Sequence, residues 1–285
     1  MRPSAAKLLW CLATGALVSA GLAGCADVEE GCLDYRALAV DVYAEAACDD
    51  CCAYPQLNLR QVPVRSDTGV VSPVTRTTAL VSDSGDTVRL TSLSYFLHDL
   101  ELELEDGTLV PLPDTFSARL SEADEFALVE RSLSRVSPLR TPLAVVGTLL
   151  TEGTAVALRM RFGLPADLVA ADPQAQRGDS PLFIALDTAL LFRDEVTASR
   201  RLRSARLVRA GAVDTVTTFV AGGASVPLRF PLATSFPLRR SFNLDVALLL
   251  PVDALLELPA GEVSAEDFAA AVYGTASVRE VGASR

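Results

Sequence analysis

The clearest pattern in the chain is a strict alternation of leucine and glutamate between Leu100 and Glu105. A period of two places successive side chains on opposite faces of an extended strand, so the leucines face a core and the glutamates face solvent. Asp106-Gly107 follows and tolerates the positive φ angles of a tight turn, after which Thr108 to Val110 runs back. This stretch therefore predicts a β-hairpin.

The residues just before this strand allow two interpretations. Extending the same phase backwards puts Phe96 and His98 on the leucine face, and Tyr95 and Leu97 on the opposite face. The first half of the strand is then buried on both faces, or a bulge near His98-Asp99 changes the phase.

Short segments rich in β-branched and apolar residues, separated by Ser, Asp and Gly turns, continue along the chain. The further strand candidates are 57–64, 78–81, 87–93, 145–150, 155–162, 182–193, 200–209, 215–221, 226–230 and 241–250. Residues 164–181 lack periodicity and predict a long loop. Ser264 precedes an apolar run and predicts the N-cap of one short helix. We expect an all-β fold, a β-sandwich of antiparallel strands with a small Cys-rich N-terminal segment and one short C-terminal helix.

The first 24 residues have the form of a targeting segment. Arg2 and Lys7 precede an apolar stretch from Leu8 to Val18, and the segment ends in Leu22-Ala23-Gly24-Cys25. This ending resembles the lipobox of bacterial lipoprotein precursors, which implies that Cys25 is lipidated and begins the mature chain. The alternative is an ordinary secretory signal with a cysteine nearby by chance.

The leader sets the expected organisation and location of the chain. We expect a signal peptide over 1–24, a lipid anchor and disulfide-rich segment over 25–55, and the sandwich over 56–285. In many Gram-negative lipoproteins an Asp directly after the lipidated cysteine favours the inner membrane. This chain has Ala26 at that position, which favours the outer membrane. The expected location is therefore an outer-membrane lipoprotein on the periplasmic or cell-surface side, held to the membrane by the Cys25 lipid.

Charge and hydropathy argue against a nucleic-acid partner and against a second membrane segment. The formal net charge is −11, and removing the leader takes away Arg2 and Lys7, so no basic face is available for phosphate groups. We therefore expect no nucleic-acid partner. The most apolar later run, 242–258, is interrupted by Asp245, Pro251 and Asp253 and predicts no second membrane segment.

Four cysteines remain after the leader and the anchor, namely Cys32, Cys48, Cys51 and Cys52. In an exported chain they indicate two disulfides with three possible connectivities. A bridge between the adjacent Cys51 and Cys52 would be strained, so each is expected to pair with Cys32 or Cys48. The alternative is a thiolate site in which Cys48, Cys51 and Cys52 hold Cu(I) or Zn(II).

The sequence around these cysteines has a resemblance of its own. Gly31-Cys32-Leu33-Asp34 and the residues up to Asp41 resemble the short Gly-Cys-Thr-Asp repeats of secreted and surface bacterial proteins. This resemblance implies calcium binding by acidic residues between the disulfides. The candidates are Asp34, Asp41, Asp49 and Asp50. The alternative is a solvated, disulfide-tied stalk beside the lipid.

The central hairpin and two later stretches resemble a known family. Residues 94–102 with Asp106-Gly107, the strand 155–164 and the loop 172–182 are similar in order and motif to MbnP-like proteins. The resemblance spans roughly residues 57–258. It implies an exported β-sandwich that binds copper, with a modified tryptophan and a histidine as ligands in the family's namesake.

This chain departs from that family at the ligands. Its one tryptophan, Trp10, lies in the leader, and His98 is its one histidine, at a position where the family usually has Ser. A multi-imidazole copper site therefore cannot form in one chain. His98 is kept as a metal candidate beside the three cysteines, against the alternative of an ordinary strand residue, and Met160 is expected in the core.

Familiar catalytic arrangements are not evident in the sequence. Ser-His-Asp and Cys-His chemistry needs a histidine oriented beside a nucleophile, and only His98 is available. We expect no enzyme. The expected function is a lipid-anchored cell-envelope binding protein that handles metal, copper by family resemblance. The alternative is a surface interaction or adhesion module that contacts a protein or glycan without a metal site.

Overall fold

The computed structural model describes residues 29–48, 51–67, 70–120, 125–141, 143–173, 175–178, 180–183, 190–193, 200–239 and 242–284. The chain divides into two compact units. Unit 1 comprises Met1–Tyr35 and Ala39–Cys52, and unit 2 comprises Arg36–Leu38 and Ala53–Arg285. The predicted signal peptide, the lipobox and Cys25 lie outside the described residues.

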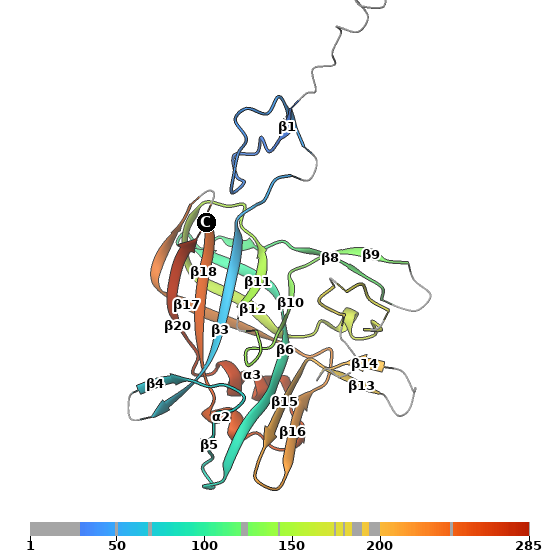
Figure 1. The fold of residues 1–285 in the computed structure, drawn as a ribbon, viewed down its shortest axis with the longest axis vertical. Helices are drawn as coiled ribbons and strands as arrows, with labels where there is room; N and C mark the ends of the chain where they lie inside the picture. Colours follow the sequence, from blue (N-terminus) through green and yellow to red (C-terminus); the bar gives the residue numbers. More distant parts are fainter. Residues whose placement is uncertain are drawn as a thin grey trace, which may run out of the picture. The chain divides into compact units, whose positions relative to one another are not determined.

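Unit 2 is built on two main sheets (Figure 1). Within the described residues the larger sheet has nine strands. Its main path runs β17 (Ser225–Leu238), β12 (Gly153–Gly163), β6 (Thr87–Leu104), β15 (Ala205–Ala210), β16 (Thr215–Val220) and β19 (Gly261–Glu262). Three shorter strands also pair with β6, namely β5 (Leu80–Val81), β7 (Leu109–Pro111) and β10 (Leu133–Val136).

The smaller sheet has five strands within the described residues. Its path is β11 (Leu143–Thr148), β3 (Gln56–Asp67), β18 (Asn243–Pro251) and β20 (Ser277–Ser284), with β4 (Val70–Pro73) beside β3. Two short hairpins stand apart from both sheets, β8 (Thr115–Ala118) with β9 (Ala127–Glu130) and β13 (Leu191–Arg193) with β14 (Arg200–Leu202). Most pairs are antiparallel, but β3 with β18 and β16 with β19 are parallel. The predicted sandwich of antiparallel strands therefore holds for most pairs, with these two as exceptions.

The two sheets share one hydrophobic core, which confirms the predicted all-β sandwich. Leu59 from β3 and Val246 from β18 belong to the same cluster as Tyr95 from β6 and Phe162 from β12. Each large apolar side chain buried in this way contributes about 1.5–3 kcal/mol relative to its exposed state. The core therefore joins the sheets across their facing sides.

A buried polar contact also links the sheets. Gln61 on β3 is fully buried, and its Oε1 accepts hydrogen bonds from the hydroxyl of Tyr95 on β6 and, at 3.0 Å, from that of Tyr273. A buried amide needs such partners because an unsatisfied polar group in the core costs about 1–3 kcal/mol. This contact therefore adds a polar link between the two sheets inside the apolar core.

Two short α-helices and one 3-10 turn occur in the described residues, α2 (Asp253–Leu256), α3 (Ala265–Tyr273) and η1 (Ala166–Leu168). The predicted cap of α3 is confirmed, because the Ser264 hydroxyl accepts a hydrogen bond of 3.0 Å from the backbone N–H of Asp267. Helix α2 was missed, since it lies in an apolar run without helical periodicity. No helix in the described part of the chain has the length and hydropathy of a membrane span.

Strand β6 confirms the hairpin and corrects the phase. β7 pairs with β6 so that Val110 lies opposite Leu102, across the Asp106-Gly107 turn. The pairing with β12 shifts register between Arg159 and Arg161, and Asp99 has φ 48°. This bulge adds one residue, so the faces exchange on either side of it.

The bulge changes which residues share the core. Tyr95 and Leu97 join Leu100 and Leu102 in the main core, whereas Phe96 belongs to a second apolar cluster. The phase extension that placed Phe96 and His98 on the leucine face was therefore wrong, whereas both expectations for this half of the strand are confirmed, the bulge near His98-Asp99 and burial on both faces.

The second cluster explains why β6 is buried on both faces. Phe96 packs there with Leu133 of β10, Phe116 of β8 and residues of the loop after β12, among them Leu164 and Leu168. The loop expected over 164–181 contains no strand in its described residues, and it covers part of the outer face of the larger sheet.

Candidate functional site

The cysteines of unit 1 are positioned by a short parallel strand pair. β1 (Glu30–Gly31) pairs with β2 (Ala46–Ala47), and Gly31 lies opposite Ala47. The next residue on each strand is a cysteine, and the Cys48 N–H donates to the Gly31 carbonyl at 3.1 Å. The pairing therefore brings Cys32 and Cys48 side by side, although they are far apart in sequence.

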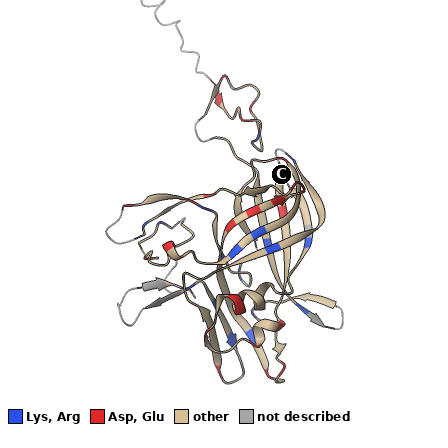
Figure 2. Cartoon of the chain, turned by 180° about the vertical axis from the view of Figure 1, so that it is seen from behind, with Lys and Arg blue, Asp and Glu red and all other residues tan. Residues whose placement is uncertain are grey.

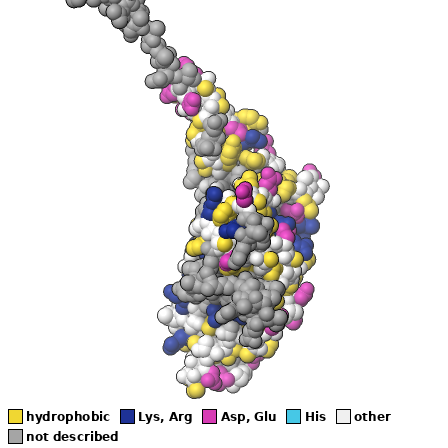
Figure 3. Space-filling model, turned by 90° about the vertical axis from the view of Figure 1, so that its right-hand side faces the viewer, with side chains coloured by type: hydrophobic (Ala, Val, Ile, Leu, Met, Phe, Trp, Pro, Cys, Tyr) yellow, Lys and Arg dark blue, Asp and Glu magenta, His cyan; other side chains and the backbone are white. Residues whose placement is uncertain are grey.

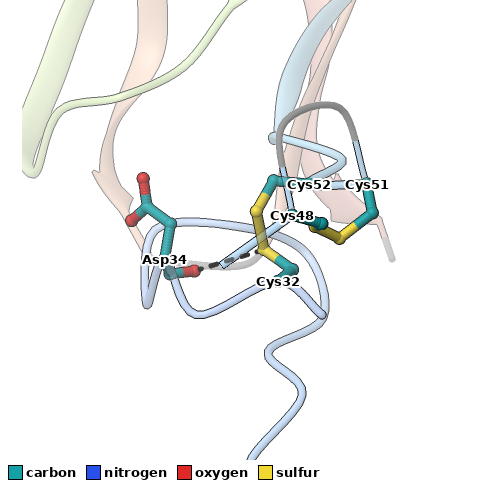
Figure 4. Close-up of a disulfide and its surroundings, with 5 residues drawn as sticks. All are labelled: Cys32, Asp34, Cys48, Cys51 and Cys52. Atoms are coloured by element: carbon teal, nitrogen blue, oxygen red, sulfur yellow. Dashed lines mark hydrogen bonds between the residues drawn. A yellow bond between two sulfur atoms is a disulfide. The ribbon is translucent and has the colours of Figure 1, made fainter. Parts of the chain in front are cut away.

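The four cysteines form two disulfides, Cys32–Cys52 and Cys48–Cys51 (Figure 4). Their Cα atoms are 5.0 Å and 5.7 Å apart, within the usual range for such bridges. Neither bridge joins the adjacent Cys51 and Cys52, as the sequence predicts. Cys32 is 6 % exposed, and its sulfur also lies 3.9 Å from the Asp34 carbonyl oxygen.

The same sulfurs are the one group in the described residues that is compact enough for a metal ion. The Sγ atoms of Cys48, Cys51 and Cys52 all lie within 4.8 Å of one another. A disulfide sulfur is not a thiolate ligand, so the oxidised form does not offer this site. Reduction turns the same atoms into soft ligands suited to Cu(I) or Zn(II).

The calcium candidates do not form a comparable group in the described residues. The Asp41 carboxylate accepts a hydrogen bond from the Tyr43 N–H at 3.0 Å, which is an arrangement typical of a turn. Neither Asp34 nor Asp41 is part of a cluster of three ligating side chains among the residues that the structure describes. Asp49 and Asp50 lie outside those residues.

His98 lies in unit 2, and its ring is 3 % exposed on the outer face of the larger sheet. Its Nε2 lies 3.0 Å from the Ser225 hydroxyl, which in turn accepts a hydrogen bond of 2.7 Å from Arg161 Nε. The Ser225 hydroxyl thus connects Arg161 to His98, and it donates to Nε2 or accepts from it according to which ring nitrogen carries the proton.

The other ring nitrogen of His98 faces a carboxylate. Nδ1 lies 3.0 Å from Asp99 Oδ2, but the contact lacks hydrogen-bond geometry because the two side chains are neighbours on the same strand. We treat it as an electrostatic contact. Burial, the larger influence, lowers the pKa of His98, and Asp99 opposes this by raising it. Both ring nitrogens are thus engaged within the protein, and His98 does not present a free metal ligand.

Ser225, His98 and Asp99 occur in the order of a serine hydrolase triad, which the sequence did not suggest. Two features differ from a working triad. The would-be nucleophile already accepts a hydrogen bond from Arg161, and Asp99 does not hold Nδ1 by a directed hydrogen bond. Asp99 also faces Arg131, whose guanidinium pairs with Asp167 at 3.0 Å. The group is best described as a polar chain on the sheet surface.

Unit 2 offers few other donors for a soft metal. Met160 is 2 % exposed in the main core, as expected, and every cysteine of the chain precedes residue 53. The family-type copper site with tryptophan and histidine ligands therefore does not fit the residues of unit 2. Within the described residues, the one group of sulfur atoms compact enough for a metal ion lies in unit 1.

A groove of about 530 Å³ opens beside the bulge in unit 2, and no pattern in the sequence predicts it. Its acidic lining residues are Asp99, Glu101, Asp114 and Glu130, and Arg131 is its one basic lining residue. Burial raises the pKa of Asp114. The groove depends on the bulge at Asp99 and on the β7–β8 connection, which are not visible as a local motif.

Charges of both signs lie on the surface of unit 2. Acidic and basic positions occur on neighbouring strands of the larger sheet (Figure 2). On the face seen in Figure 3, acidic, basic and apolar side chains are interspersed among the described residues. The acidity of the groove is therefore a local feature.

The comparisons with known proteins find a similar structure but no matching family model. No family model and no curated protein matches the chain. The structure is similar to MbnP from Methylosinus trichosporium, with 12 % sequence identity, a TM-score of 0.41, and coverage of 73 % of this chain and 80 % of that one.

Proposed function

We propose that the chain is a lipid-anchored, non-enzymatic binding protein of the cell envelope whose metal chemistry belongs to unit 1. The lipobox-like ending at Cys25 and the resemblance of residues 57–258 to MbnP-like proteins support the envelope location and a link to copper. The observation that carries the metal part is the cluster of three cysteine sulfurs within 4.8 Å. In its reduced form this cluster holds copper as Cu(I).

The anchor places unit 1 close to the membrane. Only three residues separate Cys25 from Glu29, so a lipid on Cys25 holds Glu29 within about 15 Å of the bilayer surface. The anchor is tested by mass spectrometry of the purified mature chain and by Cys25→Ala. We expect an acylated N-terminal Cys25 and release of the Cys25→Ala protein from the membrane fraction. An unmodified N-terminus would contradict the anchor.

The ligand set fits Cu(I) better than the alternatives in the described residues. Thiolates are soft ligands and prefer Cu(I), whereas carboxylates prefer Ca²⁺ and Mg²⁺. The protein with bound Cu(I) would act as a store from which copper can be released again. The ion would be held by Cys48, Cys51 and Cys52. Cys32 does not belong to this group, but it is disulfide-bonded to Cys52 in the oxidised chain.

The ligands are tested by anaerobic titration of the reduced mature chain with Cu(I) against a chromophoric chelator. We expect Cys48→Ser and Cys51→Ser each to weaken binding at least tenfold. His98→Ala is the matched control, because His98 lies in unit 2, and it should bind as the wild type does. Equal affinity in all four proteins would overturn the assignment to the cysteines.

A second candidate function follows from the acidic groove beside Asp99. Four carboxylates and one arginine line it, which suits a partner with cationic side chains. In this alternative the cysteines stay oxidised, and the sandwich acts as a surface interaction module towards a protein partner. A glycan is the other class of partner expected from the sequence, and the acidic charge of the groove favours it less.

The second candidate is tested with the oxidised chain and an oligolysine peptide, followed by amide chemical shifts. We expect shifts at residues 99–101 and 130–132, reduced in Glu130→Gln but kept in Asp214→Asn, whose carboxyl lies in a different hairpin. Unchanged spectra at millimolar peptide would remove this candidate.

A further inference from the structure

We propose that the cysteines of unit 1 form a disulfide-exchange relay in which a thiolate at Cys48 attacks Sγ of Cys52 and releases Cys32. The relay needs neither the lipid nor a metal ion. It therefore goes beyond the proposed function, and the two stand or fall separately.

Three observations place the reacting atoms together. Sγ of Cys48 lies within 4.8 Å of Sγ of Cys52, which is already bridged to Cys32. Cys48 and Cys32 follow paired strands, so the attacking sulfur and the leaving sulfur are held on neighbouring segments. Exchange between a thiolate and a disulfide needs no oxidant or reductant, because one sulfur–sulfur bond forms as another breaks.

The accessibility of the four cysteines sets the direction of the relay. Cys51 is exposed, Cys48 and Cys52 are half-buried, and Cys32 is buried. A dithiol reductant from solvent therefore attacks Sγ of Cys51, and Cys48 leaves as the thiolate. The second thiol of the reductant then displaces Cys51, and the reductant departs as a disulfide.

The internal step follows without a further reagent. The Cys48 thiolate attacks Sγ of Cys52, the Cys32–Cys52 bond breaks, and a Cys48–Cys52 bond forms. Cys32 leaves as a thiolate and takes a proton from water. The relay thus moves a free thiol from Cys48 to the buried Cys32, which solvent reductants reach poorly by themselves, while Cys51 keeps the thiol that the reductant released.

Geometry also says which cysteine cannot act as the attacking group. A bond between Cys51 and Cys52 would join adjacent residues, whose geometry does not suit a disulfide. Cys51 is therefore the entry point and Cys48 the internal nucleophile. This asymmetry provides a matched pair of variants, each with one free thiol and one remaining bridge.

The relay is tested by locating the free thiol in the purified full-length mature proteins Cys51→Ser and Cys48→Ser. Each is held at pH 8, quenched in acid, denatured, labelled with a maleimide and mapped by peptide mass spectrometry. In Cys51→Ser we expect the label on both Cys48 and Cys32, with Cys32 carrying about a tenth of the total or more. In Cys48→Ser we expect the label on Cys51 alone.

Three results would overturn the relay. One is label on Cys48 alone in Cys51→Ser, which means that the remaining bridge is not attacked. A second is a rate of appearance of the free Cys32 thiol that rises in proportion to protein concentration, which means that exchange occurs between molecules. Label on Cys32 in Cys48→Ser would also contradict the assignment of Cys48 as the internal nucleophile. Copper affinity plays no part in these readouts.

Discussion

At the residue scale, His98 is the most informative side chain because the chain has one histidine. Its ring is buried between Ser225 and Asp99, and two influences on its pKa oppose each other. Burial is the larger one and lowers the pKa below its ordinary value of 6.5. The side chain therefore stays neutral at neutral pH and serves the packing of the sheet surface.

The prediction at the residue scale is that folding lowers the pKa of His98. The histidine ring signals of the folded chain should titrate below pH 6.5, and those of the urea-unfolded chain near it. Since the folded pKa is the lower one, His98 stabilises the fold above pH 6.5 and this contribution is lost as the pH falls. A folded pKa at or above that of the unfolded chain would show that Asp99 outweighs burial.

The sequence pattern predicted only part of the surroundings of His98. The sequence showed that the histidine lies on a strand, but its face depended on one extra residue at Asp99. A bulge carries no fixed sequence motif, because it is selected by the pairing with β12 and not by local preference. For the same reason the contact with Ser225, 127 positions away, was not foreseeable.

At the element scale, an ion-pair network joins three neighbouring strands of the larger sheet. Glu103 on β6 accepts from Arg159 on β12 at 2.7 Å and from Arg229 on β17 at 2.8 Å and 2.9 Å. The sequence interpretation of the glutamates as a solvated face misses this network, because the arginines come from distant strands. Hydrogen bonds from Arg229 and Arg159 lower the pKa of Glu103 from 4.5 to about 2.

Glu103→Gln should destabilise the fold in a pH-dependent way. Because the folded pKa is the lower one, the contribution of Glu103 is present above pH 4.5 and is lost as the pH falls towards 2. The wild type should therefore unfold at higher urea than the variant at pH 6, and the difference should vanish near pH 2. Glu105→Gln, at the exposed hairpin turn, is the control; an equal effect there would contradict the network.

Gly163 at the end of β12 tests how tightly the strands pack. It has φ 113°, and a Cβ at this position would overlap the Ala224 carbonyl oxygen on the neighbouring turn. Gly163→Ala should therefore destabilise unit 2 by about 1–3 kcal/mol or more, measured by urea unfolding. Gly282→Ala is the control, because no described atom lies within 4 Å of its added Cβ. A neutral Gly163→Ala would show that the turn adjusts freely.

The element-level predictions succeeded where the signal is local. The hairpin rests on Asp106-Gly107 and the cap of α3 on Ser264, and the structure confirms both. The parallel pairing of β3 with β18 and the short helix α2 were not predicted. Pairing partners far apart in sequence are chosen by the shared core, which single-strand patterns do not encode.

At the scale of the whole molecule, chemistry and scaffold lie in separate units. Every disulfide belongs to unit 1, and unit 2 contains no cysteine. The core of the sandwich consists of leucines and other apolar and aromatic residues of unit 2, with no cysteine among them. The number and spacing of the cysteines indicated this division, but their pairing required the alignment of β1 with β2.

Reduction should leave the stability of unit 2 unchanged. A disulfide stabilises mainly by restricting the loop that it closes in the unfolded chain, and both loops lie within residues 32–52. The thermal midpoint of the β-sheet circular dichroism signal should therefore agree with and without a dithiol reductant. A fall of more than about 5 °C, roughly 1 kcal/mol or more, would show that the bridges support the sandwich.

The central claim is that metal chemistry is confined to unit 1 and requires reduced cysteines. The most direct measurement is elemental analysis of the mature chain after anaerobic exposure to Cu(I) and removal of excess metal, with the disulfides intact or reduced. The account predicts no retained copper in the oxidised chain and about one ion per reduced chain, lost when Cys48, Cys51 and Cys52 are replaced by Ser. Stoichiometric copper in the oxidised chain, or in the reduced triple variant, would place the site elsewhere and contradict the claim.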